Sequence, residues 1–356
     1  MAQFHADDLI GFGAALLTAA GAGSDEARQV AASLVLSNLR GHDSHGVMRV
    51  PSYVAQIRKR ELVAGATLRT LTETPALLVT DAGRGFGQVQ ARRLMERVME
   101  KTRAVGVACG TACNCGHVGR LGEYTEQAAE AGMAAFGTVN DNGVLRSVAP
   151  PGGVEPCIST NPISFAVPTG DRPLVFDGST SAVAQGKVTV KRLAGEPCPV
   201  GWLQDAEGNP ATDPNVLLED PPGALLPLGG AMAYKGFGLG LLVDILAGGL
   251  SGGFCPPSPA DAPECNSVLF VVWDPAFFAG AEHLRRQASG LIRLVRDSRR
   301  KAGVDRIRVP GDTSAETEAI RRRTGIPLPA DNWQKLADLA AELGVKKPNP
   351  LSAKTS

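Results

Sequence analysis

The sequence has little histidine and no excess of charge of either sign. Five of its 356 residues are histidine, and 36 Lys plus Arg balance 36 Asp plus Glu. A nucleic-acid-binding surface normally leaves a basic excess or a basic stripe, which this composition lacks, so we expect no nucleic-acid partner. With 44% hydrophobic and 20% charged residues, the chain has the composition of an ordinary globular protein.

Patterns for a membrane span and a secretory signal are also missing. The longest apolar stretch, 239–250, contains Asp244 and several glycines and is too short to cross a bilayer. The first eight residues carry neither a basic segment nor a hydrophobic segment of the secretory type. We therefore expect a soluble, cytoplasmic protein without a membrane partner.

Cysteine is present, but not in a disulfide pattern. The seven cysteines are odd in number and include no C-x-x-C pair, which suits a reducing compartment. Cys109, Cys113 and Cys115 lie close together in the sequence, and a metal or redox site is one interpretation of them. Because structural zinc needs four converging ligands, we favour the other interpretation, that they are small core residues.

Apolar residues recur at helical spacing near both ends of the chain, which predicts helices there. The expected helices span 9–20, 24–39 with Ser24 as N-cap, 47–59, 315–323 and 331–343. We interpret residues 1–75 as a helical domain on which 313–345 pack, and 346–356 as a flexible tail.

The middle of the chain, 76–312, alternates short apolar strands with helices, which predicts an α/β fold. The expected strands lie at 76–80, 105–108, 133–139, 164–167, 174–176 and 268–273. The expected helices lie near 87–99, 122–131, 234–250 and 281–301. Residues 195–225 are rich in Pro, Gly and Asp, and we expect them to form a long surface excursion.

The first candidate site is the polar motif at 41–49, Gly-His-Asp-Ser-His-Gly-Val-Met-Arg, at the join between two expected helices. There His45 can exchange a proton near neutral pH, Ser44 can hold its partner, and Arg49 can bind a carboxylate through two hydrogen bonds. These groups suit the reduction of a 2-oxo acid. Two alternatives stay open: a polar helix–helix turn with solvated histidines, and a metal-dependent hydrolase that uses His42 and His45.

The second candidate site is the glycine-rich segment 114–122, which follows an expected strand and opens an expected helix. Its glycines allow backbone N–H groups to approach an anion at a helix N-terminus, and Arg120 adds positive charge. The spacing is G-x-x-G-x-x-G, so it differs from the Rossmann fingerprint. The segment 83–88 is nearer to that fingerprint but has Gln88 in place of the last glycine, so each segment alone is a weak dinucleotide signal.

Four further patches are polar or rich in glycine at the starts or ends of expected elements. They are 159–162, which contains Thr160; 177–187; 234–238, which contains Lys235; and 310–314. A lysine at a glycine-rich helix start suits phosphate or carboxylate binding, but a solvated helix end explains it equally well. The last patch is also explained as a helix N-cap.

Taken together, these segments resemble the malate/L-lactate dehydrogenase type 2 family, and two of them most resemble its hydroxycarboxylate dehydrogenase B branch. The matching segments occur in the family's order, at 37–54, 83–88, 116–124, 159–168, 175–187, 201–214, 227–253 and 309–312. The resemblance implies a non-Rossmann, mixed and largely antiparallel sheet domain that binds a nicotinamide over 76–312, with helices and a separate helical domain. It also implies a homodimer with the active site near the interface, and NAD or NADP as cofactor.

The resemblance assigns roles residue by residue. It implies that His45 is the proton donor, Ser44 its hydrogen-bonded partner, and that Arg49 and Thr160 contact the substrate. It implies cofactor contacts at His117, Val118, Gly119, Arg120, Leu121, Asp177, Gly178, Ser179, Lys235, Arg308, Pro310, Gly311, Asp312, Thr313 and Ser314. It implies no metal site.

One departure from the family pattern bears on the substrate. The imino-acid reductases of the family carry His-Gly-Asp where this chain has Gln185-Gly186-Lys187, and a lysine cannot replace their relay aspartate. We therefore expect an NAD(P)-dependent enzyme that interconverts a small 2-oxo acid and its 2-hydroxy acid. The alternatives are a cyclic imino-acid or ureidoglycolate-type dehydrogenase, the metal hydrolase, and a non-catalytic sensor; the sequence does not choose between NADH and NADPH.

Overall fold

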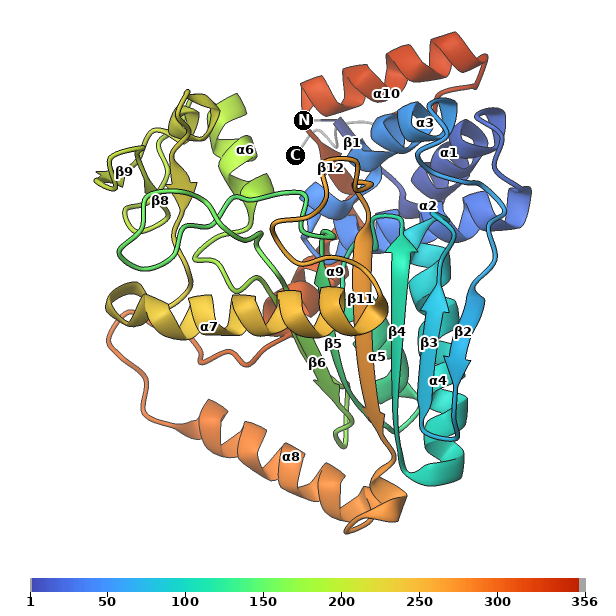
Figure 1. Ribbon diagram of the computed structural model, residues 1–356, viewed down its shortest axis with the longest axis vertical. Helices are drawn as coiled ribbons and strands as arrows, with labels where there is room; N and C mark the ends of the chain where they lie inside the picture. Colours follow the sequence, from blue (N-terminus) through green and yellow to red (C-terminus); the bar gives the residue numbers. More distant parts are fainter. Residues whose placement is uncertain (1, 352–356) are drawn as a thin grey trace.

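The centre of the molecule is a seven-stranded sheet of mixed direction. The computed structural model describes residues 2–351, and its sheet has the order β2-β3-β4-β11-β5-β6-β7 (Figure 1). Five of its six strand pairs are antiparallel and only β3–β4 is parallel, which agrees with the α/β prediction. The strands are β2 Arg69–Glu73, β3 Leu77–Asp81, β4 Val107–Cys115, β5 Ala134–Asn140, β6 Ile163–Val167, β7 Leu174–Gly178 and β11 Asn266–Trp273.

Helices α4 (Gly87–Val105) and α5 (Gly122–Glu130) cover one face of this sheet. The central strand β11 alternates side chains between the two faces, and Val268, Phe270 and Val272 are fully buried in the cluster that includes Leu94 and Tyr124 of the helices. The candidate motifs at 83–88, 116–122 and 159–162 lie in the segments that lead into or out of these strands and helices.

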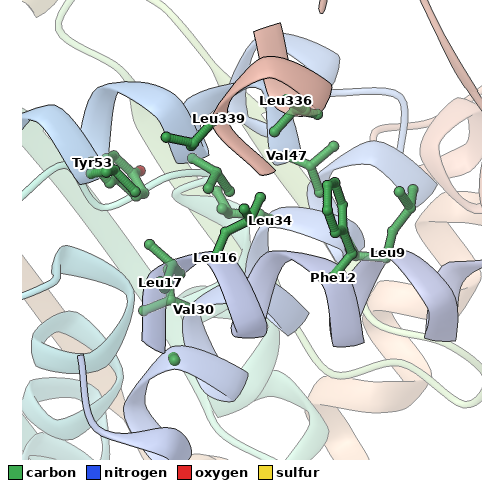
Figure 2. Packing of buried hydrophobic residues seen from close by; sticks show 14 of the residues in the cluster. Leu9, Phe12, Leu16, Leu17, Val30, Leu34, Val47, Tyr53, Leu336 and Leu339 are labelled. Carbon is green, nitrogen blue, oxygen red and sulfur yellow. The ribbon is translucent and has the colours of Figure 1, made fainter. Parts of the chain in front are cut away.

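The N-terminal helices and the last helix share a second hydrophobic cluster (Figure 2). It is built by α1 (Ala6–Ala19), α2 (Ser24–Leu39), α3 (Val50–Arg58) and α10 (Ala330–Leu343). The chain ends are also joined by an antiparallel pair of β1 (Ala2–Phe4) with β12 (Ile326–Leu328). Segments more than 300 residues apart in sequence therefore fold as one unit.

Two expectations for the N-terminal part are wrong. Strand β2 lies inside the stretch 1–75 expected to be helical, and all five of its residues are exposed, so it carries no apolar signal. Gly23, and not Ser24, is the N-cap of α2, because Ser24 already has helical geometry as the first residue of the helix.

The expected surface excursion at 195–225 has its own small core. Strands β8 (Leu203–Gln204), β9 (Pro210–Ala211) and β10 (Ala224–Leu225) form a three-stranded sheet. This sheet packs with α6 (Gln185–Leu193) around a separate cluster: Val148, Ile158, Val183, Val188, Cys198, Leu203, Val216 and Leu225. The high Pro and Gly content therefore marks tight turns within a packed lobe.

Two helices leave apolar side chains exposed. Helix α7 (Ala233–Val243) continues into a π-helical turn, Asp244–Gly249, and passes in front of the sheet in Figure 1. Helix α8 (Ala281–Asp297) has no buried residue within the described chain and stands apart from the sheet in the same view. Residues 2–351 cover one side of α7, where Val243 is buried, but leave Leu239, Leu241 and Leu242 exposed, and they bury no residue of α8.

The stretch 230–249 is the one described helical segment that is long and apolar enough to cross a membrane by length and composition. It is longer than the apolar run read from the sequence. Its Asp244 is 2% exposed and accepts hydrogen bonds from Asn140 Nδ2 at 3.0 Å and Asn161 Nδ2 at 2.6 Å. These bonds hold the second half of the segment against the sheet.

We predict that Phe4→Ala strongly destabilises the fold. Phe4 is fully buried and its ring centroid lies 4.4 Å from that of Trp333, so its removal leaves a cavity between the chain ends. The free energy of unfolding, measured by chemical denaturation, should fall by about 3–5 kcal/mol. The exposed Phe278→Ala serves as the control and should change it by less than about 0.5 kcal/mol. An equal loss of unfolding free energy in both variants would contradict a core in which Phe4 joins the two ends of the chain.

Candidate active site

The first candidate motif forms two 3₁₀ turns, Asp43–His45 and Val47–Arg49, between α2 and α3. Asn38 at the end of α2 holds both turns: its Nδ2 donates to Asp43 Oδ1 at 2.7 Å, and its Oδ1 accepts the Val47 N–H at 2.9 Å. A Cβ at Gly46 would overlap the Asn38 amide, so this close approach requires glycine. Local contacts thus define the path of the motif.

Arg321 of α9 (Asp312–Thr324) fixes the same turn from the other end of the chain. Its Nη1 and Nη2 donate to the two carboxylate oxygens of Asp43 at 2.6 and 2.9 Å, and Nη1 also contacts the Asn38 carbonyl. The sequence assigned no role to either residue: Asn38 lies in the segment 37–54 but outside the polar motif at 41–49, and Arg321 lies 278 positions from Asp43.

Residues from three predicted site segments line one cavity of about 240 Å³. Ser44, His45 and Arg49 come from the turn, His117 to Gly119 from the loop after β4, and Thr160 from the segment before β6. The sequence predicted each segment separately, and the fold brings them together. The cavity wall also includes residues to which the sequence assigned no role: Tyr53 in the segment 37–54, Asn161 in the patch 159–162, and Glu61, Asp141 and Glu264 outside every motif.

The Nδ1 nitrogen of His45 is in hydrogen-bond contact with the neighbouring serine. Ser44 Oγ lies 3.0 Å from Nδ1 of His45, and Arg49 Nε donates to the Ser44 carbonyl at 2.7 Å. Burial and, after it, the Arg49 guanidinium lower the pKa of His45 to about 4, against the opposing effect of the Asp177 carboxylate. The imidazole is therefore neutral at pH 7 and able to accept a proton.

His117 lies beside His45 in the cavity wall. The two imidazole rings are stacked, with centroids 5.5 Å apart and planes inclined by 16°. Nδ1 of His117 is 2.8 Å from Tyr53 Oη. Burial, followed by the charges of Arg49 and His45, holds the pKa of His117 well below its usual value, so the cavity contains two neutral imidazoles next to one cation.

A second cavity of about 260 Å³ collects other predicted cofactor residues. Arg120, Asp177, Pro310, Gly311 and Ser314 line it together with Arg40 and His42. Asp177 Oδ2 accepts the N–H of Gly122 at 2.7 Å, at the start of α5. Arg120 is buried and donates from Nη2 to Glu126 at 2.9 Å, so its charge is partly balanced within the protein.

The remaining predicted cofactor residues line neither of these two cavities. Leu121 is buried in the sheet cluster, and Lys235 is exposed at the start of α7 beside Tyr234. Asp312 is buried and accepts hydrogen bonds from Arg296 at 2.7 Å and from the Val309 N–H at 2.9 Å. The others are Gly178 at the end of β7, Ser179, Thr313 in α9, and Arg308, whose Nε lies 3.6 Å from Glu316.

The structure separates His42 from His45. His42 lines the second cavity and His45 the first, because a 3₁₀ turn replaces the helix face on which they were expected to converge. Within residues 2–351, no three His, Cys, Asp or Glu side chains are grouped to hold a metal ion. The geometry therefore gives the metal-hydrolase alternative no support.

Gly186, in the Gln185-Gly186-Lys187 segment that differs from the imino-acid reductases, packs against the turn Asp43–His45. A Cβ at residue 186 would lie 2.6 Å from the Ser44 Cβ, so α6 approaches the turn closely. Lys187 is exposed, and its charge contributes to lowering the pKa of His42, after burial and Arg120. The lysine thus acts on the second cavity and makes no hydrogen bond with Ser44 or His45 in the described chain.

Comparison with known proteins assigns the chain to a family. A family model described as malate/L-lactate dehydrogenase matches residues 4–337. The chain belongs to the malate/L-lactate dehydrogenase family. It is an oxidoreductase that acts on hydroxycarboxylates, and the resemblance deduced from its motifs is confirmed.

Relatives of this dehydrogenase cover nearly all of its length. Malate dehydrogenase of Pyrococcus horikoshii is 35% identical over 347 residues, 96% of this chain and 95% of the relative. Its solved structure has a TM-score of 0.88 at 31% identity and covers 97% of each chain. Hydroxycarboxylate dehydrogenase B of Escherichia coli is 35% identical over 350 residues, 96% of this chain and 95% of the relative. Delta(1)-pyrroline-2-carboxylate reductase of Ancylobacter novellus is 33% identical over 331 residues, 91% and 93% of the two chains.

We predict that His45 of the free dehydrogenase titrates far below an ordinary histidine. Its pKa is lowered from 6.5 to about 4, so the imidazole is neutral above that pH and gains a proton only as the pH falls through it. Arg49→Gln removes one cause of the shift and should move the titration upward. NMR titration of the imidazole, assigned with His45→Gln, measures both values. Titration near 6.5 in the unmodified dehydrogenase would refute the proposed electrostatics.

Proposed function

We propose that this dehydrogenase uses NAD(P) to interconvert a small 2-oxo acid and its 2-hydroxy acid, with His45 as proton donor and acceptor. The observation that carries the proposal is the convergence of His45 and Arg49 on one cavity that also reaches the glycine-bordered loop at 117–119. A bound nicotinamide would supply the hydride acceptor or donor for carbon 2 of the acid.

The residues of the cavity divide the remaining work. Arg49 has Nε occupied by the Ser44 carbonyl, which leaves its two terminal nitrogens to bind the substrate carboxylate. In oxidation, neutral His45 accepts the proton of the substrate hydroxyl as hydride leaves carbon 2. In reduction, His45 returns a proton to the oxygen as hydride arrives, so charge and protons balance in both directions.

The second cavity suits the phosphate groups of a dinucleotide in a site that is not a Rossmann fold. Nε of Arg120 is buried without a hydrogen-bond partner in the described chain, and Arg120 lines this cavity with Arg40. Gly311, in a left-handed conformation with φ of 89°, brings the start of α9 to the same wall. Unpaired donors next to a helix start favour an anion. NAD and NADP both fit this description.

A ketone or alcohol substrate is favoured over an imine. The relay aspartate of the imino-acid reductases is replaced by Lys187. This lysine is exposed, and its charge helps to lower the pKa of His42. A cyclic imino-acid or ureidoglycolate-type activity remains the alternative within the family. We also propose that the dehydrogenase works in the cytoplasm, without a nucleic-acid or membrane partner.

We predict that His45→Ala lowers kcat by about 10²–10⁴, because the variant lacks its general acid–base group. Arg49→Ala should mainly raise KM, because it removes a carboxylate contact. NADH or NADPH absorbance is followed against pyruvate, phenylpyruvate, oxaloacetate, 2-oxoglutarate and a cyclic imine. The exposed His5→Ala serves as the control and should keep full activity. A fully active His45→Ala enzyme would end the assignment.

We propose that the dehydrogenase is a homodimer. The support is the uncovered apolar surface of α7 and α8, where Leu291 is 62% and Leu294 is 70% exposed. Charge is also divided within a neutral chain: 281–308 holds nine Arg and Lys against three Asp and Glu, whereas 194–234 holds six Asp and Glu and no Arg or Lys. A second copy offers both an apolar cover and opposite charge.

We predict that the double variant Leu291→Glu/Leu294→Glu is a monomer. Two carboxylates on the exposed face of α8 would have to lose water on association, at a cost of several kcal/mol. Sedimentation velocity at micromolar concentration measures the state. Leu71→Glu, at an exposed position of β2, is the control and should remain a dimer. A monomeric unmodified protein would contradict the proposal.

A further inference from the structure

Three polar side chains from three different elements form a chain behind the active-site wall. Gln88 lies in the first turn of α4, Tyr53 in α3, and His117 in the loop after β4. Gln88 Nε2 donates to Tyr53 Oη at 2.8 Å, and Tyr53 Oη lies 2.8 Å from Nδ1 of His117. Gln88 is 1% and Tyr53 3% exposed, so water does not compete for these bonds.

The bond from Gln88 to Tyr53 has a defined direction, which limits where the hydrogen of Tyr53 can point. Because Tyr53 Oη accepts from Gln88, its single hydrogen is free to point at the remaining neighbour, Nδ1 of His117. Burial raises the pKa of Tyr53 to about 12, so its proton stays on the oxygen. A nitrogen that accepts a hydrogen bond carries no proton, and a neutral imidazole has only one N–H. If Tyr53 donates to Nδ1, His117 is the tautomer with hydrogen on Nε2.

The second nitrogen of His117 is left for a ligand. Nε2 has no hydrogen-bond partner within residues 2–351, and His117 lines the same cavity as His45 and Arg49. His45 has its own Nδ1 next to Ser44 Oγ. The wall therefore presents two imidazoles with different neighbours: Nδ1 of His117 contacts the Tyr53 phenol, and Nδ1 of His45 contacts the Ser44 hydroxyl.

The packing around Tyr53 and Gln88 supports the loop that carries His117. The ring of Tyr53 lies at the edge of the hydrophobic cluster in Figure 2 and meets Phe86 edge-on, with centroids 6.1 Å apart. A Cβ at Gly119 would lie 3.3 Å from Gln88 Nε2, so the glutamine supports the loop that carries His117. Gln88 is also the residue that breaks the dinucleotide fingerprint in the sequence.

We propose that Gln88 and Tyr53 are positioning residues that fix the tautomer of His117, so that its Nε2–H donates a hydrogen bond to the oxygen on carbon 2 of the bound acid. The donated hydrogen bond stabilises the negative charge that develops on this oxygen. Because Nε2 already holds a proton, His117 cannot take the hydroxyl proton, which goes to His45. This inference rests on the proposed interconversion of 2-oxo and 2-hydroxy acids.

Tyr53→Phe tests the inference with a nearly isosteric change. Without the phenol, Nδ1 has no donor, so His117 should populate both tautomers. We expect kcat to fall about 10- to 100-fold, as when a group that orients a functional histidine is lost, with a smaller change in the KM of the cofactor. Nitrogen-15 NMR of histidine-labelled enzyme reports the tautomer directly, and thermal unfolding checks that the fold is kept.

Gln88→Glu tests the direction of the hydrogen bonds that join Gln88, Tyr53 and His117. An ionised carboxylate only accepts, so the Tyr53 hydroxyl should turn toward it and His117 should then donate from Nδ1, which leaves Nε2 unprotonated. At alkaline pH we expect the opposite tautomer and a loss of kcat, and both should return toward the unmodified values as the carboxyl gains a proton and can donate again. Gln3→Glu, at an exposed position, is the control and should change neither.

The NMR measurement uses the enzyme without substrate, so it separates this inference from the proposed function. A proton on Nδ1 of His117 in the unmodified enzyme would overturn the inference, as would an unchanged kcat in both Tyr53→Phe and Gln88→Glu. A loss of stability with an unchanged tautomer would show a purely structural role and would also overturn it. Lack of turnover on every tested acid would instead overturn the proposed function.

Discussion

The active site depends on the paired hydrogen bonds between Arg321 and Asp43. This bidentate pair, together with the Asn38 amide, holds the turn whose next residues are Ser44 and His45. Charge-assisted bonds of this geometry are strong and directional, so they fix the orientation of the turn as well as its place. Helix α9, which lies late in the chain, therefore decides where His45 lies.

Burial and one fixed cation set the chemistry of the main cavity. Desolvation is the largest cause that lowers the pKa of both His45 and His117, and Arg49 is the next. The free site is thus ready for an anion and holds two neutral imidazoles. A carboxylate bound to Arg49 would offset the charge that disfavours protonated His45, so an anion at Arg49 and the proton affinity of His45 are coupled through a single guanidinium.

The two cavities meet at the same turn. His45 faces the cavity with Thr160 and His117, while His42, three residues earlier, faces the cavity with Asp177 and Gly311. Asp177 and Arg120 influence the pKa of both histidines, which shows that the two spaces are electrostatically linked. A ligand that spans them would pass directly beside His45.

The sequence by itself determined the family, the α/β class and the separate motifs around His45, His117 and Thr160, because local periodicity and short-range polar patterns are written in consecutive residues. Only the tertiary structure determined which side chains contact these motifs. The Asp43–Arg321 pair, the exposed strand β2 and the contact of Gln88 with Tyr53 leave no local signal. Their partners lie 35 to 278 positions away, or their faces are not buried, and only the packing of distant elements can bring such groups within hydrogen-bond distance.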